Sequence, residues 1–173
     1  MRIATWNVNG IRAAIRKGID RFFEKIDADI WLLQEVRCLP EQLPKDWAIP
    51  DGYNMILHPA EKKGYSGVAT ISRKPMLEQA RGMSGNLDPL DLEGRVLTTR
   101  HDNVTIVNTY LPSGSSKDER QKYKEEWMAQ WREYIQPMLE SDDVVIVAGD
   151  LNIAHTENDI WNPKGNSNSS GFL

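Results

Sequence analysis

Polar groups that could do chemistry follow an apolar run late in the chain. Residues 144–155 read VVIVAGDLNIAH, a run suited to a buried strand that gives way to Asp150 and Asn152. A polar turn would explain them, because Gly, Asp and Asn are ordinary turn residues. Alternatively, a rigid strand delivers a carboxylate and an amide, two positions apart and so on one side of an extended chain, to a shared reacting group. Other segments of the chain must decide between a polar turn and a functional site.

Two β-α-β units are predicted, one at each end of the chain. The first has strands at 2–8 and 30–34 around an amphipathic helix that begins near Ile11 and carries Ile15, Ile19, Phe22 and Ile26 on one stripe. The second has strands at 104–110 and from 144, around a helix from Lys117 to about Gln136. Each crossover makes its two strands parallel, so their C-terminal ends share one edge of a sheet.

Those strand ends carry chemically capable groups. Short runs near 53–58, 68–72 and 96–101 predict antiparallel strands between the two units. If the resulting sheets lie face to face, their edges meet and gather two carboxylates, two amides and a phenol in one cleft. The residues concerned are Asn7, Glu35, Tyr110, Asp150 and Asn152.

Such a set suits a hard metal ion and phosphate ester cleavage. Carboxylate and amide oxygens favour Mg²⁺ or Mn²⁺ over zinc, since neither Cys nor His accompanies them. Metal on Glu35 and Asn7 would polarise a phosphoryl oxygen, and Asp150 could orient or deprotonate water. Asn152 and Tyr110 could hydrogen-bond the developing charge. Each residue taken alone also has an ordinary structural explanation, as a turn or packing residue.

Composition bounds the class of protein. The chain has 173 residues, 40% hydrophobic and 27% charged, which indicates a single globular domain over 1–173. No apolar run approaches the roughly 20 residues that cross a bilayer, no signal peptide is evident, and there is one cysteine, so we expect a cytoplasmic protein without a membrane partner. The net charge of −4 argues mildly against a polyanion partner, although residues 11–25 hold five basic and two acidic side chains.

Several motifs together resemble one known family. They are TWNVNGIRA, LLQEVR, EKKGYSGVA, EGRV, NTYLPSG and GDLNIAH. The chain resembles the exonuclease III and AP endonuclease branch of the endonuclease/exonuclease/phosphatase superfamily over its full length. The resemblance implies an α/β fold, a four-layer α-β-β-α sandwich of two mixed sheets (DNase I-like). It also implies Mg²⁺-dependent hydrolysis of phosphodiesters in double-stranded DNA, 5′ to an abasic site or from 3′ ends.

The resemblance also assigns roles by motif position. Asn7 and Glu35 match metal ligands, with Asp150 and Asn152 beside them as further candidate ligands. In catalysis, Tyr110 matches a phosphate-contacting phenol, Asp150 a water-activating carboxylate and Asn152 an amide that stabilises the transition state. Residues that match contacts to the DNA backbone are Arg12, Lys62, Gly64 and Tyr65. Contacts of that kind position DNA without reading its sequence.

The resemblance leaves the end of the chain unmatched. The family continues past SSGFL with further strands and a closing Asp-His pair, and this sequence has no Asp-His dipeptide. We therefore expect a fold that is incomplete at the C-terminus, poorly active and prone to associate in this form, and monomeric when complete. Two alternatives stay open: a catalytically incomplete DNA-binding fragment, and a phosphoesterase of the same superfamily that acts on small molecules.

Overall fold

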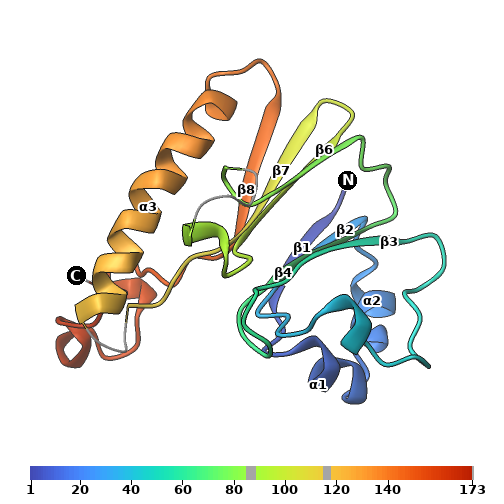
Figure 1. Cartoon of the computed structure of the whole chain (residues 1–173), viewed down its shortest axis with the longest axis horizontal. Coiled ribbons are helices and arrows are strands. Elements are labelled where there is room, and N and C mark those ends of the chain that lie inside the picture. Colours follow the sequence, from blue (N-terminus) through green and yellow to red (C-terminus); the bar gives the residue numbers. More distant parts are fainter. Residues whose placement is uncertain (85–88, 115–117, 173) are drawn as a thin grey trace.

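The fold is two four-stranded sheets packed face to face, with helices on both outer faces (Figure 1). A computed structural model describes residues 1–84, 89–114 and 118–172. In Figure 1 the long helix covers one sheet and the two short N-terminal helices cover the other. This is the predicted four-layer α-β-β-α arrangement. No helix among the described residues is long and apolar enough to span a bilayer.

The first sheet has the strand order β1-β2-β4-β3. Its strands are β1 (Ile3–Asn7), β2 (Ile30–Gln34), β3 (Asn54–His58) and β4 (Val68–Ser72). β1 pairs with β2 in parallel, and the two other pairings are antiparallel. The predicted parallel unit and the predicted middle strands are both confirmed.

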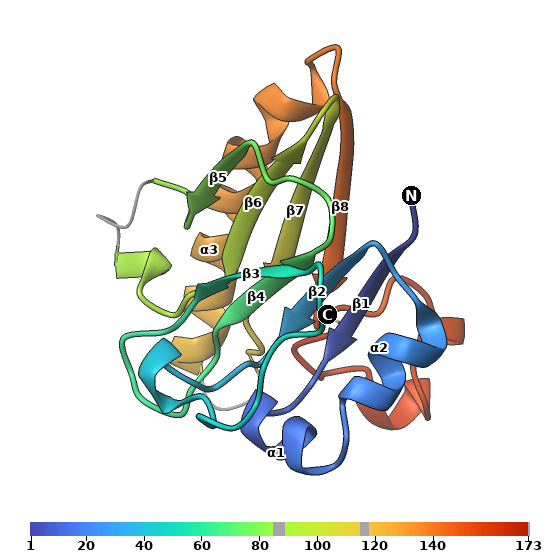
Figure 2. The same cartoon turned by 90° about the vertical axis from the view of Figure 1, so that its right-hand side faces the viewer.

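The second sheet has the order β5-β6-β7-β8 (Figure 2). Its strands are β5 (Glu78–Arg81), β6 (Val96–His101), β7 (Val104–Tyr110) and β8 (Val144–Asp150). β7 and β8 are parallel, as predicted, and the other pairs are antiparallel. β5 was not predicted, because its four residues read EQAR, are all exposed and carry no apolar alternation.

The helices differ from the prediction in two respects. The single helix expected from Ile11 is two helices, α1 (Ile11–Arg16) and α2 (Asp20–Ile26), separated at Gly18, whose φ is 82°. The change of direction places Phe23 in the core and leaves Phe22 46% exposed, so the predicted stripe is wrong beyond Ile19. A φ of this sign is cheap for glycine and ends the helix.

The long helix α3 (Asp118–Leu139) continues past the predicted end at Gln136. Pro137 lies inside it, two residues before its end, where it removes one intrahelical hydrogen bond. The predicted first residue, Lys117, lies outside the described residues. After β8, residues 151–172 form only the short 3-10 helices η3 (Glu157–Asp159) and η4 (Pro163–Asn166).

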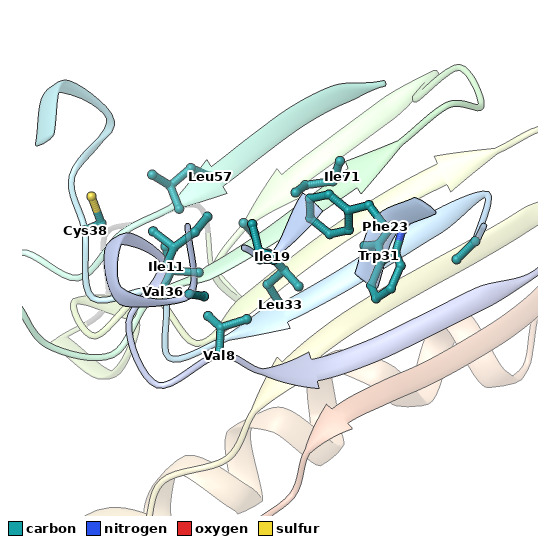
Figure 3. Close-up of a cluster of buried hydrophobic side chains, with 13 residues drawn as sticks. Val8, Ile11, Ile19, Phe23, Trp31, Leu33, Val36, Cys38, Leu57 and Ile71 are labelled. Atoms are coloured by element: carbon teal, nitrogen blue, oxygen red, sulfur yellow. The ribbon is translucent and has the colours of Figure 1, made fainter. Parts of the chain in front are cut away.

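The side chains of β2, all of them buried, alternate between two layers of the core. Trp31 and Leu33 pack against α1 and α2, in the cluster of Figure 3. Ile30 and Leu32 point the other way and meet Ile106 of β7 between the sheets. Successive strand residues face opposite sides, so β2 reads as a continuous apolar run because both of its faces are covered.

The last residue of β2 continues the inner face with a polar group. Gln34 donates a hydrogen bond of 2.8 Å from Nε2 to Oδ1 of Asn108 on β7, and both residues are buried. Asn108 in turn donates to the Ala69 carbonyl at 2.9 Å. This buried amide pair joins the two sheets one or two residues from the strand ends that carry the candidate site. It fixes how the two edges face each other.

Candidate active site

Four strand ends meet in one hydrogen-bonded cluster. Nδ2 of Asn7 donates to Oε1 of Glu35 at 2.9 Å and to Oδ2 of Asp150 at 2.7 Å. The phenol of Tyr110 donates to the same Oε1 of Glu35 at 2.7 Å. Two carboxylates, an amide and a phenol from opposite sheets are therefore in direct contact, as the strand-end argument predicted.

Sheet register brings these residues together. Asn7 stands opposite Gln34 in the β1–β2 ladder, so Glu35 follows at the same edge. Tyr110 stands opposite Asp150 in the parallel β7–β8 ladder. β1 also lies against β8, so the C-terminal ends of the two parallel pairs face each other. The arrangement thus follows from two parallel crossovers and one face-to-face packing.

Gly149 allows the close strand pairing that places Asp150. A Cβ on Gly149 would lie 1.8 Å from the carbonyl oxygen of Thr109 on β7, and the residue has a φ of 148°. No side chain fits there without separating β8 from β7. The glycine before the candidate carboxylate is therefore a packing requirement of the site.

Glu35 is held as a carboxylate by the groups around it. The residue has a left-handed φ of 52°, which turns the chain out of β2, and it forms an ion pair with Arg37. Burial acts to raise the pKa of Glu35, but hydrogen bonds from Asn7 and Tyr110 and the charge of Arg37 lower it overall. Arg37 was not among the predicted site residues, although it closes the LLQEVR motif.

Tyr110 is held as a neutral phenol. Burial raises the pKa of Tyr110, and the hydrogen bond to Glu35 and the Glu35 charge raise it further. The guanidinium of Arg95 lies 4.6 Å from the centre of the Tyr110 ring and donates to the Tyr110 carbonyl at 3.0 Å. Tyr110 consequently keeps its proton and is a hydrogen-bond donor with a fixed direction, toward Glu35.

Asn152 departs from the predicted geometry. β8 ends at Asp150, and Asn152 has a left-handed φ of 48°, so the two residues do not continue one extended chain. The backbone N–H of Asn152 donates to Oδ1 of Asp150 at 3.1 Å, and its Nδ2 donates to the Leu111 carbonyl at 2.9 Å. Asn152 is thus joined to the cluster by its hydrogen bond to Asp150. The prediction of a shared strand face was wrong, because a tight turn follows Asp150 at once.

The predicted DNA contacts fall on two segments. Lys62, Gly64 and Tyr65 lie between β3 and β4, with the Lys62 ammonium 5.2 Å from the centre of the Tyr65 ring. Gly64 has a φ of 72°, and a Cβ there would meet nothing within 4 Å. Arg12 lies on α1, half-buried, and belongs to a separate segment.

A half-buried charged network links Tyr65 to the cluster. Glu93 accepts from Arg95 at 2.7 Å and from Arg120 of α3 at 2.8 Å. Both guanidiniums also donate to the Tyr65 hydroxyl, at 3.4 Å and 3.2 Å. Burial acts to raise the pKa of Glu93, but the two arginines lower it overall. Glu93 and Arg95 stand in the EGRV motif, whose pattern gave no role, and Arg120 carried no local signal at all.

The donor set fits a hard divalent cation. Oε1 of Glu35 and Oδ2 of Asp150 converge on one amide nitrogen, and the amide oxygen of Asn7 accepts from the Asn9 N–H at 3.0 Å. No group of three or more His, Cys, Asp or Glu suited to a metal occurs among the residues that the structure describes. Mg²⁺ commonly takes one or two protein carboxylates and completes its shell with water and substrate phosphate. A site with two carboxylates meets that requirement.

The fold is that of a known class of protein. The Endonuclease/Exonuclease/phosphatase family matches residues 4–172, so the chain belongs to that family. The exodeoxyribonuclease of Bacillus subtilis is 38% identical over 173 residues, 99% of this chain and 66% of that protein. The DNA-(apurinic or apyrimidinic site) endonuclease of Dictyostelium discoideum is 36% identical over 99% of this chain and 47% of that protein.

Solved structures agree with this assignment. An AP endonuclease from Archaeoglobus fulgidus superposes with a TM-score of 0.87 at 25% identity, covering 100% of this chain and 65% of the other. The 3′-5′ exonuclease NExo of Neisseria meningitidis gives 0.84 at 26% identity, covering 96% of this chain and 63% of the other. The chain therefore spans about half to two thirds of the length of the relatives that it matches.

Proposed function

We propose that the protein is a metal-dependent hydrolase that cleaves phosphodiester bonds of double-stranded DNA at abasic sites or from 3′ ends. One observation carries the proposal: Asn7, Glu35, Tyr110 and Asp150 form a single hydrogen-bonded cluster at the meeting edges of the two sheets. The names of the relatives, an exodeoxyribonuclease and an AP endonuclease, support DNA as the substrate.

Glu35 and Asn7 would hold the cation. Asp150 and Asn152, at the end of β8 and in the turn that follows it, would be further oxygen donors. We propose Mg²⁺ or Mn²⁺, since the donors are hard oxygens without nearby thiolate or imidazole. When bound, such an ion supplies Lewis acidity to a phosphoryl oxygen. The lowered pKa of Glu35 keeps this ligand ionised at neutral pH.

The remaining steps belong to side chains of the chain itself. Asp150 accepts hydrogen bonds from Asn7 and from the Asn152 N–H, which fixes its orientation for holding or deprotonating an attacking water. The neutral phenol of Tyr110 can donate to a phosphate oxygen as charge builds there. The amide of Asn152 would supply a second donor to the same charge.

DNA would approach over the segment between β3 and β4 and over α1. Lys62 and Arg12 supply positive charge to backbone phosphates, and the exposed backbone at Gly64 allows close approach. Tyr65 presents a hydroxyl already oriented by Arg95 and Arg120. These residues would bind DNA and would take no part in the chemistry at Glu35.

Cleavage of an abasic duplex over a Mg²⁺ titration tests the proposal. We expect Glu35→Ala to remove most metal-dependent cleavage while the thermal transition is kept, and Glu133→Ala, an exposed change on α3, to behave like wild type. Near-normal turnover of Glu35→Ala at ordinary Mg²⁺ would refute the metal assignment. Wild-type protein that binds the duplex without cleaving it would favour a DNA-binding fragment. Hydrolysis of small phosphate esters alone would favour a phosphoesterase that acts on small molecules.

A further inference from the structure

Lys124 is a buried cation on the inner face of α3. Its side chain is 2% exposed, and its ammonium donates to the Asn152 carbonyl at 3.1 Å and the Ser170 carbonyl at 2.7 Å. The hydroxyl oxygen of Ser170 lies at 3.5 Å. Lys124 forms no ion pair with any residue that the structure describes. Three neutral oxygens of the chain, two of them backbone carbonyls, therefore replace water around this charge.

Burying an ammonium in this way is costly. Burial lowers the pKa of Lys124, and no nearby carboxylate offsets that effect among the described residues. An apolar side chain at position 124 would avoid this desolvation, but it would leave the two carbonyls without a hydrogen-bond donor. The three donors of an ammonium match the three oxygens. Burial of the ammonium thus lowers the stability of the fold, and in return the ammonium holds two backbone segments in place.

The first of these segments carries the end of the candidate site. Asn152 is fixed at three points: its carbonyl by Lys124, its N–H by Oδ1 of Asp150, and its side-chain amide by the Leu111 carbonyl. The left-handed φ of 48° turns the carbonyl inward toward α3. Losing the Lys124 contact would free the peptide group that follows Asn152.

The second segment, residues 169–172, closes the same junction. The Ser170 hydroxyl donates to Oε1 of Gln121 on α3 at 2.6 Å, and the Gly171 carbonyl accepts from the Ala154 N–H at 2.7 Å. A Cβ on Gly171 would lie 3.0 Å from the Asn152 carbonyl oxygen, so a larger residue would push these two segments slightly apart. In Figure 1 this part of the chain lies beside the N-terminal end of α3.

We propose that Lys124 is a positioning residue for the candidate active site. By holding the Asn152 carbonyl, its ammonium sets the direction of the Asn152 amide and, through the Asn152 N–H, of the Asp150 carboxylate. Lys124 touches no reacting atom itself. The inference rests on the proposed hydrolase function, but its structural part, the restraint on residues 151–154, can be measured without turnover.

A purely structural lysine and a positioning lysine predict different results. The first lowers the free energy of unfolding and leaves the folded protein with normal kinetics. The second lowers kcat in the folded protein with little change in KM, because misplaced groups act on the transition state more than on substrate binding. It also loosens the backbone of residues 151–154.

The experiment compares Lys124→Met and Lys124→Arg with Lys122→Met. Lys122 lies on the same helix and is 76% exposed, with only a 3.8 Å ion pair to Glu126, so it controls for loss of a lysine from α3. Thermal melts establish the temperature range in which each variant is folded. Abasic-duplex kinetics and amide hydrogen exchange of residues 151–154 are then measured within that range. Lys124→Gln, which keeps a donor, replaces the Met variant if the latter does not fold.

We expect Lys124→Met to lose roughly 10- to 100-fold in kcat, with KM within about twofold, and to exchange faster at 151–154. Lys124→Arg should recover part of both, and Lys122→Met should match wild type. Wild-type kcat in folded Lys124→Met would overturn the proposal, and so would unchanged exchange at 151–154. A wild-type protein without cleavage activity would instead overturn the proposed function, while the exchange measurement would still decide whether Lys124 restrains this loop.

Discussion

The phenol of Tyr110 donates a 2.7 Å hydrogen bond to Oε1 of Glu35, across the space between the two sheets. The residues lie 75 positions apart in sequence, one at the end of β7 and one just after β2. The contact therefore depends on the packing of the sheets as well as on each strand. The same hydrogen bond acts to lower the pKa of Glu35 and, together with burial, to raise that of Tyr110.

Replacing Tyr110 with Phe should change both catalysis and the titration of Glu35. The loss of a hydrogen bond to an ionised group, worth about 1.5 to 3 kcal/mol, should lower kcat/KM by about 10- to 100-fold. The pKa of Glu35 should rise, since one group that favours its carboxylate is gone. A ¹³C NMR titration of the Glu35 carboxyl and kinetics on an abasic duplex measure the two effects. An unchanged Glu35 titration would show that the contact is absent in solution.

Asp150→Asn should lower turnover far more than DNA affinity. The carboxylate that would orient or activate water acts in the transition state, while an amide of the same size keeps the packing beside Gly149. Asn152→Ala should show the same division, because its amide would stabilise developing charge. Single-turnover rates at saturating duplex and equilibrium binding give the two quantities. A parallel loss of affinity and rate would place these residues in DNA binding instead.

How far the sequence determined this site depends on the origin of each contact. Asn7, Glu35, Tyr110 and Asp150 were predicted to meet because parallel strands share an edge, and local apolar patterns located those strands. Arg95 and Glu93 lie two residues apart in the EGRV motif, but nothing local linked that pair to the site. Arg120 was missed because it reaches Glu93 and Tyr65 only through tertiary packing. The same holds for the buried pair of Gln34 and Asn108.

Backbone turns account for the errors in the fold predicted from the sequence. The apolar stripe from Ile11 continued across Gly18, and nothing in the stripe showed that the chain changes direction there. Asn152 was expected to extend β8, whereas the chain adopts a left-handed turn after Asp150. Both are single-residue changes of φ, which residue periodicity does not report.

Lys62→Ala should weaken DNA binding without slowing the bound enzyme. A lost phosphate contact releases one counterion fewer, so the plot of log affinity against log salt should become shallower by about 0.9. Arg12→Ala should act in the same way from α1. Lys25→Ala, an exposed change at the end of α2, serves as the control. Reduced turnover of Lys62→Ala at saturating duplex would contradict a role confined to binding.

The last prediction concerns His58, which ends β3 and is 6% exposed. Its Nε2 is buried and has no hydrogen-bond partner in the described part of the chain. Burial lowers the pKa of His58 from 6.5 to about 4, an effect that the charge of Asp91 opposes and that of Arg81 reinforces. The folded protein therefore keeps this imidazole neutral where the unfolded chain would protonate it.

The sign of the effect on stability follows from proton binding. Between pH 6.5 and 4 the unfolded chain binds more protons at His58 than the folded protein does, so the free energy of unfolding should fall as pH falls through this window. His101, whose pKa burial also lowers, adds to the same trend. Above pH 7 neither group contributes a slope. Urea unfolding at a series of pH values measures the dependence, and His58→Gln should reduce the slope relative to wild type. An equal slope in wild type and His58→Gln would mean that His58 takes up its proton in the folded state as readily as in the unfolded chain.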